Sequence, residues 1–130
     1  MFRSLEKVTG KRLDMTNRIV NQKAELFSDR ILKLHKYLMV NKKEAILSKQ
    51  ILRSGTSVGA NLAEAECASS RKDFISKNYI AFKEINETMF WLRKLLSGQY
   101  IKQTEFISVY KDAEEIKKIL TKILKTLNSQ

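Results

Sequence analysis

The chain of 130 residues contains no proline, and this absence limits its fold more than any other feature. Proline marks turns and edge strands in mixed folds, and it is excluded from helix interiors because it has no amide hydrogen and clashes with the preceding turn. With only four glycines as well, the chain has few positions that would interrupt a helix. We therefore expect long helices joined by short loops.

The composition is that of one globular domain, with 43% hydrophobic and 30% charged residues. A membrane span needs about 20 mostly apolar residues, whereas the longest apolar runs here, such as 37–40 and 89–92, have four. The amino terminus has no apolar segment of the kind found in secretory signals, so we expect a cytoplasmic protein. A single cysteine, Cys67, excludes an internal disulfide.

Apolar residues recur at spacings of three and four in four segments, which predicts four helices. The predicted ranges are 17–40, 43–68, 70–97 and 104–128. The first helix carries its core stripe at Val20, Ala24, Phe27, Ile31, Leu34 and Leu38. The second carries Leu47, Ile51, Val58, Leu62 and Ala65. The fourth, the most regular heptad, carries Phe106, Val109, Ala113, Ile116, Leu120, Ile123 and Leu127.

Helix ends are indicated by polar residues at capping positions. Asn41 and Ser70 are each followed three residues later by an acidic residue, the pattern that satisfies free amide groups at the start of a helix. Gly98 is expected to end the third helix at the C′ position. Two glycines at the centre of the second helix, in 54–60, predict close packing of a neighbouring helix, with a local bend as an additional possibility.

Four helices with short connections predict an all-α, antiparallel up-down-up-down four-helix bundle over 17–130, preceded by a basic amino-terminal arm at 1–16. The third helix, however, carries two apolar stripes. One contains Phe74, Ala81, Ile85, Leu92 and Leu95, and the other contains Ile75, Tyr79, Phe82, Met89 and Leu96. This second stripe, with Trp91 beside it, is either part of the core or exposed on a monomer. Exposure would favour a homo-oligomer with dimeric or ring symmetry.

A polar stripe runs beside the apolar stripe of the second helix. Its members, spaced by four, four and three residues, are Arg53, Ser57, Asn61 and Glu64. The third helix offers partners at matching spacing, namely Glu84, Glu87 and Thr88. If this face is buried, the groups form an ion-pair and hydrogen-bond network that fixes the register of the two helices. The alternative is that they line a binding cleft.

Catalytic chemistry finds little support in the sequence. A di-iron site in a helical bundle needs two Glu-x-x-His pairs, and the single His35 has no such neighbour. Neither Cys67 nor any serine has the surroundings of a nucleophile, and the glycines do not form a phosphate-binding loop. We therefore expect no enzymatic activity, no metal and no cofactor.

The formal net charge of +11 favours contact with polyanions, which would be salt-dependent and weakly specific for sequence. A basic surface that is merely solvated is the alternative. The residues predicted to contact phosphates all lie on the third helix and are Arg71, Lys72, Lys77, Lys83, Arg93 and Lys94.

The polar stripe also carries a family resemblance. Residues 48–65 are SKQILRSGTSVGANLAEA, followed by KDFI at 72–75 and AFKEINET at 81–88. These segments resemble the bacterial four-helix-bundle proteins encoded in intervening sequences of 23S ribosomal RNA genes. The resemblance covers about residues 17–127, and the family signature falls on Arg53, Ser57, Asn61, Glu64, Glu84 and Glu87.

The resemblance implies a homopentameric ring without established enzymatic activity. The family is more distantly similar to the accessory variability proteins of diversity-generating retroelements, which associate with a reverse transcriptase and with nucleic acid. Two hypotheses follow. The chain is expected to bind structured RNA or DNA through its basic surface, or else to act as a scaffold that engages a protein partner such as a reverse transcriptase.

Overall fold

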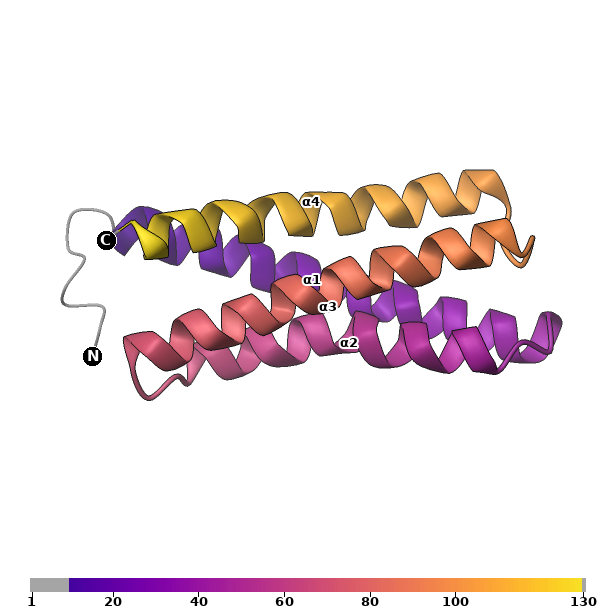
Figure 1. The fold of residues 1–130 in the computed structure, drawn as a ribbon, viewed down its shortest axis with the longest axis horizontal. Coiled ribbons are helices and arrows are strands. Elements are labelled where there is room, and N and C mark those ends of the chain that lie inside the picture. Colours follow the sequence, from indigo (N-terminus) through magenta and orange to yellow (C-terminus); the bar gives the residue numbers. More distant parts are fainter. Residues whose placement is uncertain (1–9, 130) are drawn as a thin grey trace.

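The computed structural model describes residues 10–129, which form four helices and no strands. The helices are α1 (Gly10–Asn41), α2 (Ile46–Glu66), α3 (Arg71–Ser97) and α4 (Gln103–Asn128). Loops of four or five residues join them, and each helix packs against two neighbours, so that α4 closes against α1. α1 begins and α4 ends at the same end of the bundle (Figure 1). The predicted all-α, antiparallel up-down-up-down bundle is confirmed.

The helix boundaries agree with the sequence for three helices and differ for the first. α2, α3 and α4 begin and end within three residues of the predicted positions. α1 begins at Gly10, seven residues before the expected start, and Leu13 in this added segment is buried. Residues 10–16 of the expected arm are therefore part of α1, and 1–9 lie outside the described residues.

The two predicted amino-terminal caps have different outcomes. The Ser70 hydroxyl accepts a hydrogen bond from the Asp73 amide at 3.1 Å, as predicted for the start of α3. The prediction for Asn41 is wrong, because this residue is the last of α1 and α2 begins only at Ile46. The carboxylate of Glu44 still accepts from an amide in the first turn of α2, that of residue 48, at 2.9 Å.

Gly98 ends α3, but not in the left-handed conformation expected of a C′ glycine. Its φ is −80°, and the left-handed residue is the next one, Gln99, with a φ of 63°. Glycine is instead favoured by space, because a Cβ at residue 98 would lie 2.9 Å from two ring carbons of Tyr100. Close contact with that ring explains this glycine better than backbone freedom does.

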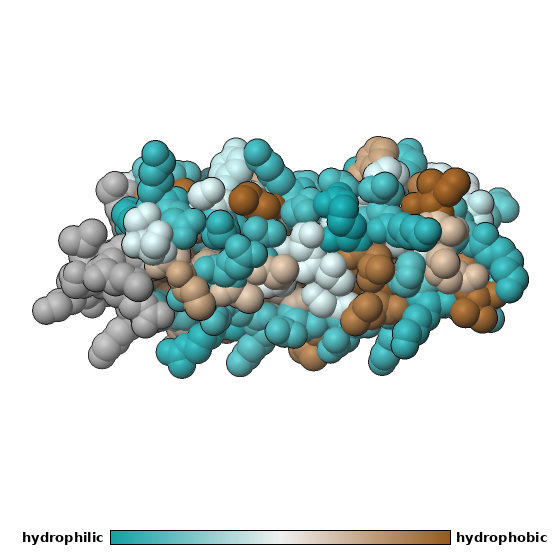
Figure 2. Space-filling model, turned by 90° about the horizontal axis from the view of Figure 1, so that it is seen from below, coloured by the Kyte–Doolittle hydropathy of each residue, from teal (hydrophilic) through white to brown (hydrophobic). Residues whose placement is uncertain are grey.

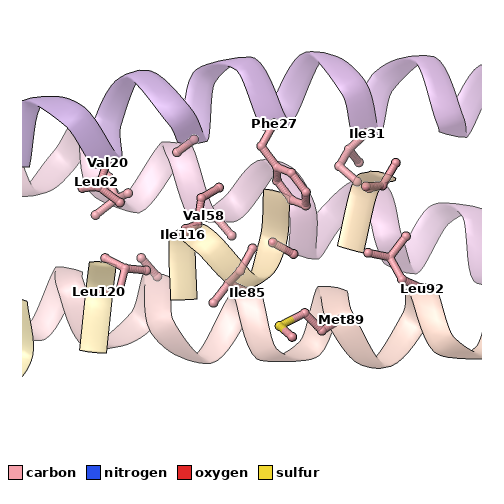
Figure 3. Packing of buried hydrophobic residues seen from close by; sticks show 14 of the residues in the cluster. Val20, Phe27, Ile31, Val58, Leu62, Ile85, Met89, Leu92, Ile116 and Leu120 are labelled. Carbon is pink, nitrogen blue, oxygen red and sulfur yellow. The ribbon is translucent and has the colours of Figure 1, made fainter. Parts of the chain in front are cut away.

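The predicted apolar stripes form the core between the four helices (Figure 3). All six residues of the α1 stripe are buried, as are the first α3 stripe and most of the α2 and α4 stripes. Leu47 and Phe106, at the ends of their stripes, are only partly buried. The side chains that meet at the centre come from every helix, for example Phe27, Val58, Ile85 and Ile116.

The glycines of α2 mark a close approach to α1. A Cβ at Gly55 would lie 2.8 Å from Cγ1 of Ile31, closer than side chains tolerate, and one at Gly59 would lie 3.2 Å from Oγ of Ser28. α2 continues without interruption from Ile46 to Glu66 across this segment. Close helix packing, the first of the two predictions, therefore accounts for the small residues.

The second apolar stripe of α3 is more covered than we expected. Met89 is buried, and Ile75 and Phe82 are partly buried and packed against the core, so that only Tyr79 is largely exposed. One bundle does cover most of this stripe, contrary to the sequence argument. Half of the large apolar side chains that are exposed among the described residues belong to α1, and four of them, Met15, Ile19, Leu26 and Val40, lie on its outer side.

Candidate functional site

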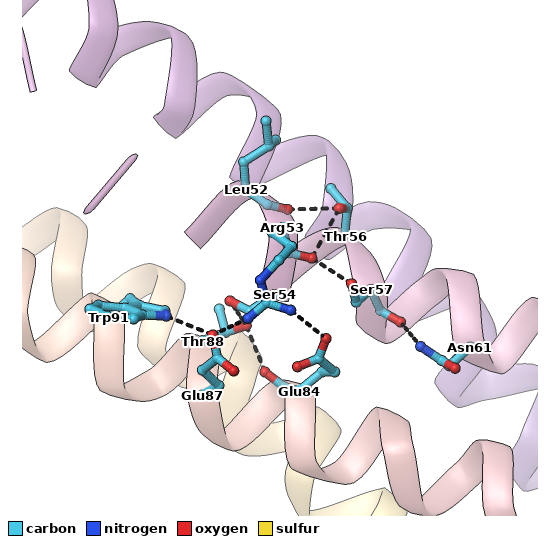
Figure 4. A network of polar contacts seen from close by, with 10 residues as sticks. All are labelled: Leu52, Arg53, Ser54, Thr56, Ser57, Asn61, Glu84, Glu87, Thr88 and Trp91. Atoms are coloured by element: carbon cyan, nitrogen blue, oxygen red, sulfur yellow. Dashed lines mark hydrogen bonds and ion pairs between the residues drawn. The ribbon is translucent and has the colours of Figure 1, made fainter. Parts of the chain in front are cut away.

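Arg53 of α2 joins two carboxylates of α3. Its Nη1 lies 2.9 Å from Oε2 of Glu84, and its Nη2 donates to Oε2 of Glu87. The same Glu87 oxygen accepts from Nε1 of Trp91 at 2.9 Å (Figure 4). The three α3 residues are spaced by three and four positions, so they lie on the side of α3 that faces α2. The predicted contact between Arg53 and the two glutamates is present in the structure.

This cluster lies at the edge of the bundle and not in its interior. The exposed fraction of the side chain is 49% for Arg53, 36% for Glu87 and 16% for Glu84. The hydrogen bonds from Trp91 and Arg53 hold the pKa of Glu87 below its ordinary value, and the bond to Glu87 raises the pKa of Arg53. The pair is therefore charged at neutral pH, and solvent reduces its contribution to stability.

A buried hydroxyl pair lies beneath the ion pairs. Thr88 Oγ1 is 2.8 Å from Oγ of Ser54 and equally close to the carbonyl oxygen of Glu84, and both hydroxyl residues are fully buried. Because a buried hydroxyl without a partner is costly, this contact favours one register of α2 against α3. Helical spacing predicts Thr88 as a partner but gives no indication of Ser54.

The remaining members of the polar stripe make other contacts. Ser57 Oγ donates to the carbonyl of Arg53 at 2.6 Å, and Asn61 Nδ2 donates to the carbonyl of Ser57 at 2.8 Å, both within α2. Glu64 is exposed, and its carboxylate lies 3.9 Å from Nζ of Lys77. Within the polar stripe, short side-chain contacts to α3 therefore come from Arg53.

The six basic residues of α3 fall into two groups. Arg71 donates to the carbonyl of Leu127 at 2.6 Å and so links α3 to α4, whereas Lys77 lies 3.4 Å from Asp73 within α3 and 3.9 Å from Glu64 of α2. The other four make no ion pair with a described carboxylate, and all four are exposed. They are Lys72, Lys83, Arg93 and Lys94.

Three of these cations lie against aromatic rings. The Nζ of Lys83 is 5.3 Å from the ring centre of Tyr79, and the ring of Phe90 has Arg93 Cζ at 5.9 Å and Lys94 Nζ at 5.4 Å. Tyr79 and Phe90 are 46% and 41% exposed. Apolar spacing predicts Tyr79 as part of a stripe and does not indicate that Phe90 is exposed. Each ring nevertheless has a lysine four residues later, which is the spacing of neighbours on a helix.

The described residues contain no group of three or more His, Cys, Asp or Glu side chains placed to hold a metal ion. Nor does any helix among them combine the length and apolar character needed to cross a membrane. His35 links α1 to α2, with Nδ1 at 2.7 Å from Oγ of the buried Ser48. Its position indicates a role in helix packing.

Residues 16–122 match the family of 23S rRNA-intervening sequence proteins. The chain belongs to this family. It is also similar to the crystal structure of a protein of unknown function, from the S23 ribosomal protein family of Bacteroides thetaiotaomicron. The two are 48% identical, the TM-score is 0.83, and the match covers 85% of this chain and 98% of that one. No curated protein matches the chain.

The region shared with the intervening-sequence family contains both features described above. It includes the Arg53 cluster between α2 and α3 and the whole basic and aromatic face of α3. The family match therefore confirms the resemblance to the 23S rRNA intervening-sequence proteins. It does not assign a reaction or a ligand to either feature.

Proposed function

We propose that this intervening-sequence protein is a non-enzymatic, homo-oligomeric bundle that binds structured RNA or DNA through phosphate contacts on a basic surface. The observation that carries the proposal is the outer face of α3. Lys72, Lys83, Arg93 and Lys94 are exposed there without acidic partners among the described residues. Cations that are not engaged with carboxylates remain available for phosphates.

The charge of the chain supports the same proposal. The formal net charge is +11. On the face seen from below in Figure 1, hydrophilic side chains border a paler central band and several hydrophobic patches (Figure 2). Each phosphate contact releases counterions, so with four contacts in one subunit log K should fall with the logarithm of the salt concentration with a slope of about −3 to −4. Binding of this kind is weakly specific for sequence because phosphates carry no base identity.

Self-association is supported by the apolar side chains on the outer side of α1. Met15, Ile19, Leu26 and Val40 are spaced by four, seven and fourteen residues, so they line one side of the helix, opposite the buried stripe. An exposed apolar line on a long helix favours a protein interface. We propose a homo-oligomer, with the pentameric ring implied by the family resemblance as the specific form. A sedimentation mass equal to that of the monomer at micromolar concentration would contradict it.

The test of nucleic-acid binding is fluorescence anisotropy with a structured RNA, a DNA duplex and a single strand, each titrated over a range of salt. We expect affinity that falls steeply as the salt concentration rises. A variant in which three α3 lysines are replaced by glutamine should bind more weakly, and the slope of log K against log salt should be shallower by about 2 to 3. Its substitutions are Lys72→Gln, Lys83→Gln and Lys94→Gln.

A matched variant changes the net charge equally but leaves the α3 face intact. Its substitutions are at exposed lysines of α4, namely Lys111→Gln, Lys118→Gln and Lys122→Gln. Equal loss of affinity in both variants would mean that the charge acts without a defined surface. Absence of binding by the unmodified protein at low salt would overturn the proposal and favour a scaffold that engages a protein partner such as a reverse transcriptase.

A further inference from the structure

We infer that the outer face of α3, together with a groove between α3 and α4, binds unpaired nucleotides, with the bases stacked on aromatic rings and the phosphates on lysines. This inference rests on the proposed function and specifies its ligand as a single-stranded segment of nucleic acid. The features that carry it are the groove, the two exposed rings and the distribution of charge around them.

The groove is open to solvent and has a volume of about 440 Å³. Tyr79 and Phe82 of α3 form one wall, with ring centres 6.1 Å apart and planes inclined by 55°. The α4 wall is formed by Thr121, Leu124, Lys125, Asn128 and Ser129. The volume lies within the range of sites for small organic groups, about 300 to 1,000 Å³, and the lining combines aromatic surface with a few polar groups.

The polar groups of the groove match the edge and the backbone of a nucleotide. The Asn128 amide both donates and accepts hydrogen bonds, as the edges of all bases require. The Thr121 hydroxyl donates to the Lys117 carbonyl at 2.8 Å, and its oxygen remains able to accept. Lys125 on one wall and Lys83 beside the Tyr79 ring place positive charge on both sides of the groove. A base held here would have its phosphate within reach of an ammonium group.

Phe90 provides a second stacking surface on the same side of α3. It is eleven residues after Tyr79, which is close to three full helical turns and about 16 Å along the axis. Arg93 and Lys94 flank this ring as Lys83 flanks the first. Exposed rings interleaved with cations along one line are the arrangement that binds single strands, because every base has a face that can stack.

The acidic residues of this part of α3 do not interrupt the line. Between residues 74 and 97 they are Glu84 and Glu87, and both lie on the side that faces α2, engaged with Arg53. Both carboxylates are therefore paired with Arg53, away from the face of α3 that would contact phosphates. A single strand, whose base faces are free, can use both the rings and the cations, whereas a duplex can use only the cations.

The experiment measures the anisotropy of a labelled unstructured pyrimidine strand, an abasic strand with the same number of phosphates, and a duplex, all with the full chain. We expect the pyrimidine strand to bind most tightly. Replacing both rings with apolar, non-aromatic side chains, Tyr79→Leu with Phe90→Leu, should weaken its binding about tenfold or more. Binding of the abasic strand and the duplex should change little.

A matched variant keeps both rings. Tyr79→Phe with Phe90→Tyr should bind the pyrimidine strand like the unmodified protein, and circular dichroism should show the helical content of all variants unchanged. If the leucine variant binds that strand as tightly as the unmodified protein does, or if the duplex binds at least as tightly as the strand, the inference is wrong while the proposed function stands. If no nucleic acid binds at low salt, both fail.

Discussion

Two glycines one turn apart in α2 provide a direct test of the close packing between α1 and α2. Gly55 and Gly59 both lie in the helix interior, so replacing either with alanine should improve helix propensity by about 1 kcal/mol. Their surroundings differ. The new Cβ at residue 55 would lie 2.8 and 2.9 Å from Cγ1 and Cγ2 of Ile31, which are fixed in the core. The new Cβ at residue 59 would meet the Ser28 hydroxyl at 3.2 Å and the Ala24 carbonyl oxygen at 3.5 Å.

The magnitudes follow from these contacts. Overpacking a core by one methyl group costs about 1 to 3 kcal/mol, so Gly55→Ala should lower the free energy of unfolding by about 1 kcal/mol after the gain in propensity. Gly59→Ala meets only tight but tolerable contacts and should raise it by roughly 0.5 kcal/mol. The propensity gain is the same at both positions, so the difference reports packing alone. A difference near 1.5 kcal/mol corresponds to about 6 °C in melting temperature.

The assay is chemical and thermal unfolding followed by far-ultraviolet circular dichroism, at one fixed protein concentration because self-association would alter the apparent stability. Ile31→Ala supplies the double-mutant cycle, since it removes Cγ1 and Cγ2, the two carbons that would lie within 3 Å of the new Cβ, and leaves only the Ile31 Cβ position at 3.3 Å. In that background Gly55→Ala should become stabilising. Equal stabilisation by alanine at residues 55 and 59, with no coupling to residue 31, would refute the packing argument.

Three further predictions concern the polar contacts. Arg53→Ala should lower the free energy of unfolding by about 1 kcal/mol, because the guanidinium is half exposed, even though Glu84 loses its partner. A buried pair would cost several kcal/mol, so a loss above about 3 kcal/mol in urea unfolding would contradict this prediction. The hydrogen bonds from Trp91 and Arg53 lower the pKa of Glu87 in the folded protein. The ionised Glu87 carboxylate therefore contributes its full stabilisation above the ordinary glutamate pKa of about 4.3, and this contribution is lost as the pH falls through the lower pKa of the folded state. Melting temperatures against pH should therefore fall less steeply in acid for Glu87→Gln, and parallel curves would argue against the linkage. Ser70→Ala removes the cap of α3 and should cost about 1 kcal/mol, measured against Ser69→Ala as a control that leaves the cap bond intact.

Several features of the fold could be predicted because they depend on local periodicity. Three of the four helices were located to within three residues, since each carries a regular apolar stripe and lies between polar loops. The start of α1 was missed because residues 10–16 contribute one buried apolar side chain, Leu13, seven residues before Val20. One residue in seven is too sparse a pattern to mark a helix without the tertiary contacts that bury it.

The polar cluster was predicted in part. Helical spacing placed Arg53 opposite Glu84 and Glu87, and the structure has these contacts. Spacing did not reveal that Ser57 and Asn61 bond within their own helix, because a short polar side chain on a helix can equally reach the carbonyl four residues earlier. The degree of exposure was likewise undetermined, since it depends on how far α3 extends over the side of α2.

The sequence by itself determined the fold class, the number of helices and most residues of the core, because the period of the apolar pattern and the absence of proline act within each segment. Only the tertiary structure decided which of the remaining apolar side chains stay exposed. Met89 and Phe82 share a stripe with Tyr79 by spacing, yet Met89 is buried and Phe82 is partly buried, whereas Tyr79 is left largely exposed beside the groove. The reason is that exposure depends on the position of the neighbouring helix, and that position is set by contacts between residues far apart in the chain.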